Sequence, residues 1–188
     1  MKVLVVVDMI KAFALRGLKE GSLFFDDAEK IIPFVVAKVN EYLEKGWYII
    51  FLGDNHDYND MEFARFSRHA VANSLSAELI DELKHALMGK NVIYIPKTRY
   101  SGFFRTDLNQ YIKAQELEKA TFEFVGVCTG ICNTDTIGDF ANRDMKTAIY
   151  RDGVADLPNV AYGIEDCSMP MNDIMLARMA FVYGTEII

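Results

Sequence analysis

Two cysteines lie four residues apart in the segment GVCTGICNTDT, residues 126–136, directly after the apolar run 122–127. A thiol in this position can act as a nucleophile once it loses its proton, or it can serve as a small packing residue in a core. Cys128 and Cys132 could also form a redox pair, although redox dithiols commonly have the shorter Cys-x-x-Cys spacing. Residues elsewhere in the chain must decide between a nucleophile, a packing residue and a redox pair.

Other residues with useful chemistry also follow apolar runs. Asp8 comes directly after the first run of the chain, and Lys97 comes shortly after a later one. Asp54 and His56 follow a run that lies between these two. A carboxylate can take a proton from a thiol, and a lysine can orient that carboxylate and stabilise charge beside it. Together these residue types are those of a nucleophilic thiol with its base.

The elements that must position these residues are visible in the hydropathy pattern. Apolar runs typical of buried strands lie at 3–7, 47–52, 92–95, 122–127 and 147–150, with a sixth in the C-terminal TEII. Segments with helical spacing lie between them, at 26–46, 76–90, 106–117, after Cys132 and at 172–184. This alternation predicts an α/β fold, a three-layer αβα sandwich with a central, mostly parallel six-stranded sheet. We expect residues 1–188 to form a single domain.

In such a sheet, reactive groups lie beyond the carboxyl ends of the strands, so Asp8, Asp54, Lys97 and a thiol are expected at one edge. Cys132 falls where ICNTDTIGDFANRD begins a helical pattern. A thiol at a helix N-terminus feels the positive end of the helix dipole, which predicts a lowered pKa for Cys132. Backbone N–H groups of the same turn can stabilise an oxyanion. We interpret Cys132 as the nucleophile and Cys128 as a source of a backbone N–H.

Composition excludes several classes of protein. The chain has 20 basic and 27 acidic residues and a net charge of −7, which argues against a nucleic-acid or anionic-membrane partner. The short apolar run before Asp8 is not a signal peptide, and no stretch approaches the roughly 20 apolar residues of a membrane span. The three cysteines are therefore expected to be free thiols. The sequence predicts a cytoplasmic protein.

The stretches VVVDMIKAF, PKTRYSGFFRTDL and GVCTGIC together resemble the isochorismatase-like cysteine hydrolases, and within them the nicotinamidases or pyrazinamidases. The resemblance covers essentially the whole chain, and the ordered set Asp8, Lys97 and Cys132 matches the family's Asp–Lys–Cys triad. It implies that Cys132 attacks an amide carbonyl of a small-molecule substrate. Asp8 then accepts the thiol proton and later donates it to the leaving ammonia, while Lys97 orients and electrostatically assists both groups.

The same resemblance implies a cis peptide bond before Cys128. It also implies an oxyanion hole made by the backbone N–H groups of Cys128 and Cys132. Family members are commonly dimers or tetramers, so a homo-oligomer is expected.

The segment DNHDYNDMEFARFSRH contains the donors for a metal ion. Resemblance to the nicotinamidases implies one divalent ion per chain, held by Asp54, His56 and His69. Some nicotinamidases use three such ligands and others add a Glu seven residues before the last His, a spacing that Glu62 and His69 have. Carboxylate and imidazole donors suit zinc, our first expectation, as well as iron or manganese. In nicotinamidases this metal binds the pyridine nitrogen of the substrate, which predicts a nitrogen-heterocycle carboxamide. The alternative is a solvated acidic loop with two incidental histidines.

Phe13, Phe66 and Phe104 are at positions resembling the ring-stacking residues of the family, and core packing is the alternative for each. The chain also departs from the nicotinamidase pattern. Apolar residues replace a usual Gln and Asp, Asn and Asp replace a usual Trp and Pro, and glycine replaces an acid: Ile10, Ala12, Asn55, Asp57 and Gly130. FSRH stands where FPPH is common, so Arg68 could pair with a carboxylate-bearing substrate or point to solvent.

The sequence therefore favours hydrolysis of nicotinamide to nicotinate and ammonia through a thioester on Cys132. Another cysteine amidohydrolase of the same fold, acting on a small amide, ureido or carbamoyl substrate, stays open. Isochorismatase itself splits a vinyl ether and needs neither a thiol nor this donor set. From a different class, a thiol redox or binding protein that has lost hydrolysis would leave Asp8 and Lys97 without a role.

Overall fold

A computed structural model describes all of residues 1–188, and it contains one sheet of six strands. The strands run in the order β3-β2-β1-β4-β5-β6, and every neighbouring pair is parallel. Their bounds are β1 Lys2–Val7, β2 Tyr48–Asp54, β3 Val92–Lys97, β4 Thr121–Val127, β5 Lys146–Ala155 and β6 Glu186–Ile187. The predicted α/β fold with a central six-stranded sheet is confirmed, and the sheet is parallel throughout.

The central strand β1 explains why its sequence is continuously apolar. Residues 3–7 have no exposed surface. Because successive side chains of a strand point to opposite faces, Leu4 and Val6 join one core while Val3, Val5 and Val7 join the other. A strand that is buried on both faces has no position where a polar side chain could meet water.

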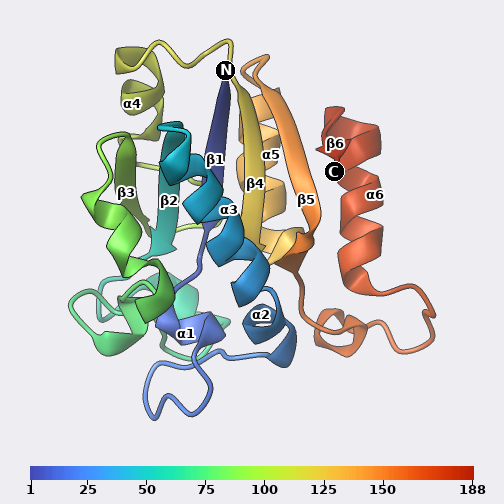
Figure 1. Cartoon of the computed structure of the whole chain (residues 1–188). Coiled ribbons are helices and arrows are strands. Elements are labelled where there is room, and N and C mark those ends of the chain that lie inside the picture. The colour runs from blue at the N-terminus through green and yellow to red at the C-terminus, as the bar shows by residue number, and fades with distance from the viewer.

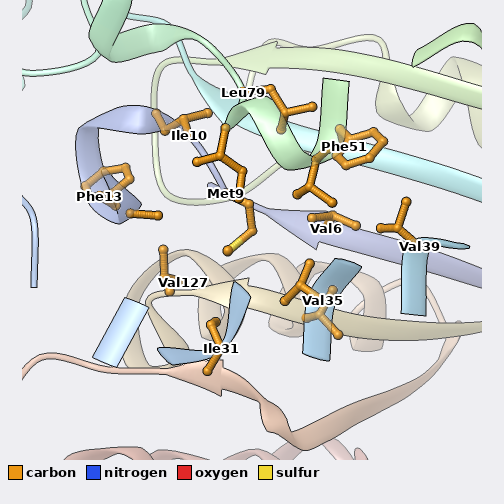
Figure 2. Packing of buried hydrophobic residues seen from close by; sticks show 14 of the residues in the cluster. Val6, Met9, Ile10, Phe13, Ile31, Val35, Val39, Phe51, Leu79 and Val127 are labelled. Carbon is orange, nitrogen blue, oxygen red and sulfur yellow. The ribbon is translucent and has the colours of Figure 1, made fainter. Parts of the chain in front are cut away.

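Helices cover both faces of the sheet (Figure 1). The helix α3 lies over one face, where its buried Val35 and Val39 pack near Val6 and Phe51 of the sheet (Figure 2). The helices α4, α5 and α6 contribute apolar side chains to the other core. The helix bounds are α1 Lys11–Ala14, α2 Asp26–Lys30, α3 Ile32–Glu44, α4 Leu108–Ala114, α5 Thr134–Ala141 and α6 Met171–Tyr183. None of them is long and apolar enough to cross a membrane.

The predicted helix at 76–90 is replaced by two shorter 3-10 helices. Leu75–Ala77 forms the first, and Asp81–Met88 forms the second. Only Leu83 and Ala86 of the second are buried, and they are three residues apart. Residues at this spacing align on one edge of a 3-10 helix, so the tighter helix buries both against the sheet.

The strands β1 and β4 approach each other closely near their carboxyl ends. Gly126 has a φ of +107°, and a Cβ atom there would lie 2.0 Å from the carbonyl oxygen of Val7. Only glycine fits this position. The close approach brings the segment that follows β4 next to Asp8, which follows β1.

Replacement of Phe140 tests the core between the sheet and α5. The ring of Phe140 is fully buried and contacts the rings of Phe103, Phe122 and Phe124. We expect Phe140→Ala to lower the free energy of unfolding by about 3–5 kcal/mol, measured by urea denaturation. The control is Phe181→Ala on α6, whose side chain is 91% exposed and should change stability by less than about 0.5 kcal/mol. Equal effects of the two variants would contradict this description of the core.

Candidate active site and metal centre

Side chains from the ends of four strands meet at one edge of the sheet, the lower edge in Figure 1. Asp8 follows β1, Asp54 ends β2, Lys97 ends β3 and Cys132 follows β4. All four are buried. Reactive groups in a parallel sheet are expected beyond the carboxyl ends of its strands, which we call the strand-end rule. This rule located the four groups that were expected together from the sequence.

The ammonium group of Lys97 lies at the centre of this group. Its Nζ is 2.8 Å from Oδ2 of Asp8, forms an ion pair with Asp54 and lies 3.4 Å from Sγ of Cys132. The backbone N–H of Asp54 donates to Oδ1 of Asp8 at 2.8 Å, which fixes the Asp8 carboxylate from the other side. The ligating atoms of Asp8, Asp54 and Cys132 all lie within 4.8 Å of one another.

Burial and charge act against each other in this cluster. Burial and the neighbouring Asp54 carboxylate raise the pKa of Asp8 to about 6, against the lowering effect of the Lys97 ammonium. Burial also disfavours charge on Asp54, but Lys97 and the nearby histidines outweigh it and hold the pKa of Asp54 below its usual range. The two carboxylates in turn overcome the burial of Lys97 and raise its pKa well above the ordinary value.

The expectation of a lowered pKa for the Cys132 thiol is wrong. Burial raises the pKa of Cys132 well above its ordinary value, and the Asp8 and Asp54 carboxylates add to that effect, while Lys97 only partly offsets it. The helix dipole acts at the terminus of one helix, whereas two buried carboxylates act at contact range. The thiol is therefore protonated at rest, and a nucleophile here needs a base at hand.

The turn that carries both cysteines differs from the predicted helix start. The peptide bond between Val127 and Cys128 is cis, as the family resemblance implies. A π-helical turn, Thr129–Asn133, then precedes α5, so Cys132 lies inside that turn rather than at the first residue of an α-helix. Turns of this type are rare and occur frequently at functional sites.

A buried carboxylate that the sequence analysis missed holds this turn. Oδ2 of Asp156 accepts a hydrogen bond from the backbone N–H of Gly130 at 2.7 Å, and its Oδ1 accepts one from the Tyr162 hydroxyl at 2.7 Å. A Cβ atom at Gly130 would lie 2.7 Å from Oδ2 of Asp156, so the glycine departure leaves room for this contact. Asp156 directly follows β5, and the strand-end rule would have found it had that strand been predicted to its true end.

A second cluster shares Asp54 with the first. The ligating atoms of Asp54, His56, Glu62 and His69 all lie within 4.8 Å of one another, and all four side chains are buried. A parallel bridge between His56 and Val71 returns the chain to β2 and brings His69 beside His56.

The outer nitrogens of both histidines are held in place. Nδ1 of His56 lies 3.3 Å from Oδ2 of Asp60, and Nδ1 of His69 lies 2.8 Å from the carbonyl oxygen of Ser67. Asp60 is itself held by Arg99, whose Nη1 lies 2.8 Å from Oδ1. Such partners orient the imidazoles of metal sites, and the sequence analysis did not identify Asp60 in this role.

Two inner atoms of this cluster, Nε2 of His56 and Oε2 of Glu62, are buried and have no hydrogen-bond partner. The charged groups that face them, Asp54 and Arg99, lie 3.7 and 4.0 Å away, beyond hydrogen-bond distance. Unpaired buried polar atoms are costly, and a bound cation would satisfy them. Burial, and to a lesser degree the Asp54 carboxylate, raise the pKa of Glu62, because the charged form lacks water and an adequate partner. The donor set therefore fits a divalent metal ion.

A cavity of about 440 Å³ opens onto both clusters. Phe13 and Phe66 line it, and the ring centroid of Phe13 lies 5.6 Å from that of His69. Phe104 does not line it, which corrects its expected position. Its side chain is 42% exposed and lies under the guanidinium of Arg105, because the turn after β3 carries it away from the edge. Tyr100 lines the cavity from that turn instead.

The structure also shows where three other residues that depart from the nicotinamidase pattern lie. Arg68 lies 4.0 Å from the ring centroid of Tyr58 and borders a different hollow, so it is not positioned to meet a ligand beside Cys132. Ile10 and Ala12 have no exposed surface and pack in the core (Figure 2 labels Ile10). Apolar packing there replaces the polar residues that are usual in nicotinamidases.

The sequence model of the isochorismatase domain matches residues 2–175. The chain belongs to the isochorismatase family. This family includes the ureidoacrylate amidohydrolase RutB of Rhizobium rhizogenes, which is 38% identical over 173 residues that cover 81% of this chain and 70% of that protein.

Solved structures of relatives share the fold over the whole chain. The nicotinamidase/pyrazinamidase PncA from Bacillus subtilis is 27% identical, with a TM-score of 0.84, and covers 99% of this chain and 98% of its own. The pyrazinamidase of Pyrococcus horikoshii in complex with zinc is 25% identical, with a TM-score of 0.80, over 100% of this chain and 98% of its own. This isochorismatase-family hydrolase thus resembles relatives with different named substrates.

Removal of the Asp156 carboxylate tests the support of the π-helical turn. In Asp156→Ala the Gly130 N–H and the Tyr162 hydroxyl lose their acceptor, so we expect stability to fall by about 1–3 kcal/mol. The turn should also loosen, which we expect to change the rate at which a small thiol reagent modifies Cys132 by about tenfold or more. Unfolding curves and mass spectrometry of the labelled protein measure the two effects. Asp166→Ala, at an exposed loop position, is the control, and an equal response would contradict the role given to Asp156.

Proposed function

We propose that this isochorismatase-family hydrolase is a metal-dependent cysteine amidohydrolase that converts nicotinamide to nicotinate and ammonia. The observation that carries the proposal is the position of Asp54, which belongs both to the four-donor cluster and to the group around Cys132. A ligand spanning the cavity would meet a metal site at one point and a thiol at another. A ring nitrogen and a carboxamide on one small ring match that pair.

In the proposed reaction, Sγ of Cys132 attacks the carboxamide carbon while Asp8 accepts the thiol proton. The backbone N–H groups of Cys128 and Cys132 stabilise the oxyanion. The C–N bond breaks as Asp8 returns the proton to the leaving ammonia, which leaves a thioester on Cys132. Water, deprotonated by Asp8, then attacks the thioester carbon and releases nicotinate and the thiol. Lys97 stays charged and holds the Asp8 carboxylate throughout.

Asp54, His56, Glu62 and His69 would hold one divalent ion, for which zinc is our first proposal. When bound, the ion supplies a Lewis-acid contact for the pyridine nitrogen. The relative solved with zinc supports this choice, and iron or manganese suits the same donors.

A ureido substrate is the second candidate, since RutB is 38% identical to this chain. A ureidoacrylate carries a carboxylate, which would need a cationic partner on binding. The residues that line the cavity include no lysine or arginine. The proposed ion would be a cation in this cavity, but in this proposal it contacts the ring nitrogen, so the lining favours a neutral amide and ranks nicotinamide first.

Ammonia release from nicotinamide by the purified protein tests the proposed reaction. We expect steady turnover that falls by at least about 10³-fold in Cys132→Ala, because removal of a nucleophile eliminates the thioester route. Cys167→Ala, which removes the exposed thiol, is the control and should keep full activity. Turnover that survives in Cys132→Ala would exclude this mechanism.

Metal content tests the donor cluster independently of activity. We expect about one divalent ion per chain by elemental analysis, and an affinity for zinc at least about 100-fold lower in His69→Ala. His85→Ala is the matched control, because His85 is exposed and bonds only Asn40 at 2.8 Å. If both variants retained the ion equally, the cluster would not be the metal site.

A further inference from the structure

The proposed reaction uses only part of the cavity. Its named participants are the two polar clusters, and the rings of Phe13, Phe66 and Tyr100 line the cavity beside them. Five apolar residues of the lining take no part in it. We call them the apolar wall: Leu23, Phe24, Phe25, Ile131 and Leu157.

Contacts outside the cavity hold this wall in place. The backbone N–H of Leu23 donates to the carbonyl oxygen of Ala12 at 2.8 Å, next to Phe13. The guanidinium of Arg16 lies 4.8 Å from the ring centroid of Phe24. At the other segment, the backbone N–H of Leu157 donates to Oδ1 of Asp156 at 2.8 Å. Packing of Leu23, Phe25, Ile131 and Leu157 against the core adds to these contacts.

The wall is only half buried, although it is apolar and lies in a hollow. Concave apolar surface that stays in contact with water gains free energy when an apolar ligand group covers it. A small ring that bears only a carboxamide has no such group to offer.

The size and charge of the cavity also favour a ligand with an apolar, uncharged group. Its volume of about 440 Å³ lies in the range of sites for drug-sized ligands and exceeds what a single small ring fills. The titratable groups of its lining are three acids, a histidine, a tyrosine and the two thiols. Arg16, which lies against Phe24 of the wall, is already paired with Asp26 and Glu29, so an anionic substituent against the wall would lack a free cationic partner.

We propose that the preferred substrate is a neutral heteroaromatic carboxamide whose ring carries an apolar substituent, and that this substituent lies against the apolar wall. The inference rests on the proposed amide hydrolysis at Cys132 and narrows its substrate class. Nicotinamide is then the minimal substrate of the site.

A panel of substituted nicotinamides tests the inference. One series carries a propyl group at each free ring carbon in turn, and a matched series carries a carboxymethyl group at the same carbons. We expect at least one propyl isomer to have a kcat/KM about tenfold or more above that of nicotinamide, because each methylene buried in an apolar pocket adds discrimination. Its carboxymethyl counterpart should be slower than nicotinamide.

A change in the wall should alter this preference. We expect Leu157→Ala to lower the ratio of kcat/KM for the best propyl isomer to that for nicotinamide by about tenfold. Leu23→Ala tests the opposite segment in the same way, should the first variant fold poorly. Leu75→Ala is the matched control, because Leu75 is 52% exposed and lies outside the cavity. Its ratio should equal that of the unaltered protein.

The outcomes separate the inference from the proposed function. Hydrolysis of nicotinamide with every propyl isomer slower would overturn the apolar wall as a substrate site and leave the amidase intact. Binding of the same compounds to Cys132→Ala, measured by calorimetry, gives a readout that does not need turnover. If nicotinamide were not hydrolysed but the propyl isomer bound about tenfold more tightly than nicotinamide, the apolar wall would be supported as a binding site and the proposed reaction would be overturned. Equal binding of all compounds would overturn the wall.

Discussion

The buried ion pairs of Lys97 are the interaction on which the site depends. An ammonium group without exposed surface costs several kcal/mol of desolvation unless it is paired, and Asp8 and Asp54 pair it from two strands. Because each of the three residues ends or follows a different strand, the pairs also fix how the carboxyl ends of β1, β2 and β3 meet. Removal of Lys97 would leave two buried carboxylates facing each other beside a thiol.

Asp54 extends this constraint to the rest of the cavity. Its Oδ2 lies 3.7 Å from Nε2 of His56 and 3.9 Å from Nε2 of His69, so one carboxyl group faces the lysine and both imidazoles. The positions of Asp8, beside the thiol, and of Asp54, in the donor cluster, are thus fixed by one network of ion pairs and hydrogen bonds. We therefore expect a change in the donor cluster and a change in the group around Cys132 not to act independently of each other.

The sheet and the strand-end residues were predictable because their signals are local. Continuous apolar runs predict buried parallel strands, and the residue after each run identifies the edge of the sheet. The same rule missed Asp156 because exposed Arg151 and Asp152 interrupt the apolar run of β5, which nevertheless continues to Ala155. The pKa of Cys132 could not be predicted from the helix dipole alone, since it depends first on the burial of the thiol and then on carboxylates brought in from two other strands. The exchange of Phe104 for Tyr100 depends on the path of a loop, which periodicity does not describe.

The most direct measurement of the central claim is rapid-quench mass spectrometry of the intact protein mixed with nicotinamide. We expect a transient mass increase equal to one nicotinoyl group, which peptide mapping places on Cys132 and which is absent from Cys132→Ser. Full turnover of nicotinamide with the label on another residue, or unaltered turnover by Cys132→Ser, would contradict the account of Cys132 as the nucleophile held beside Asp8 and Lys97.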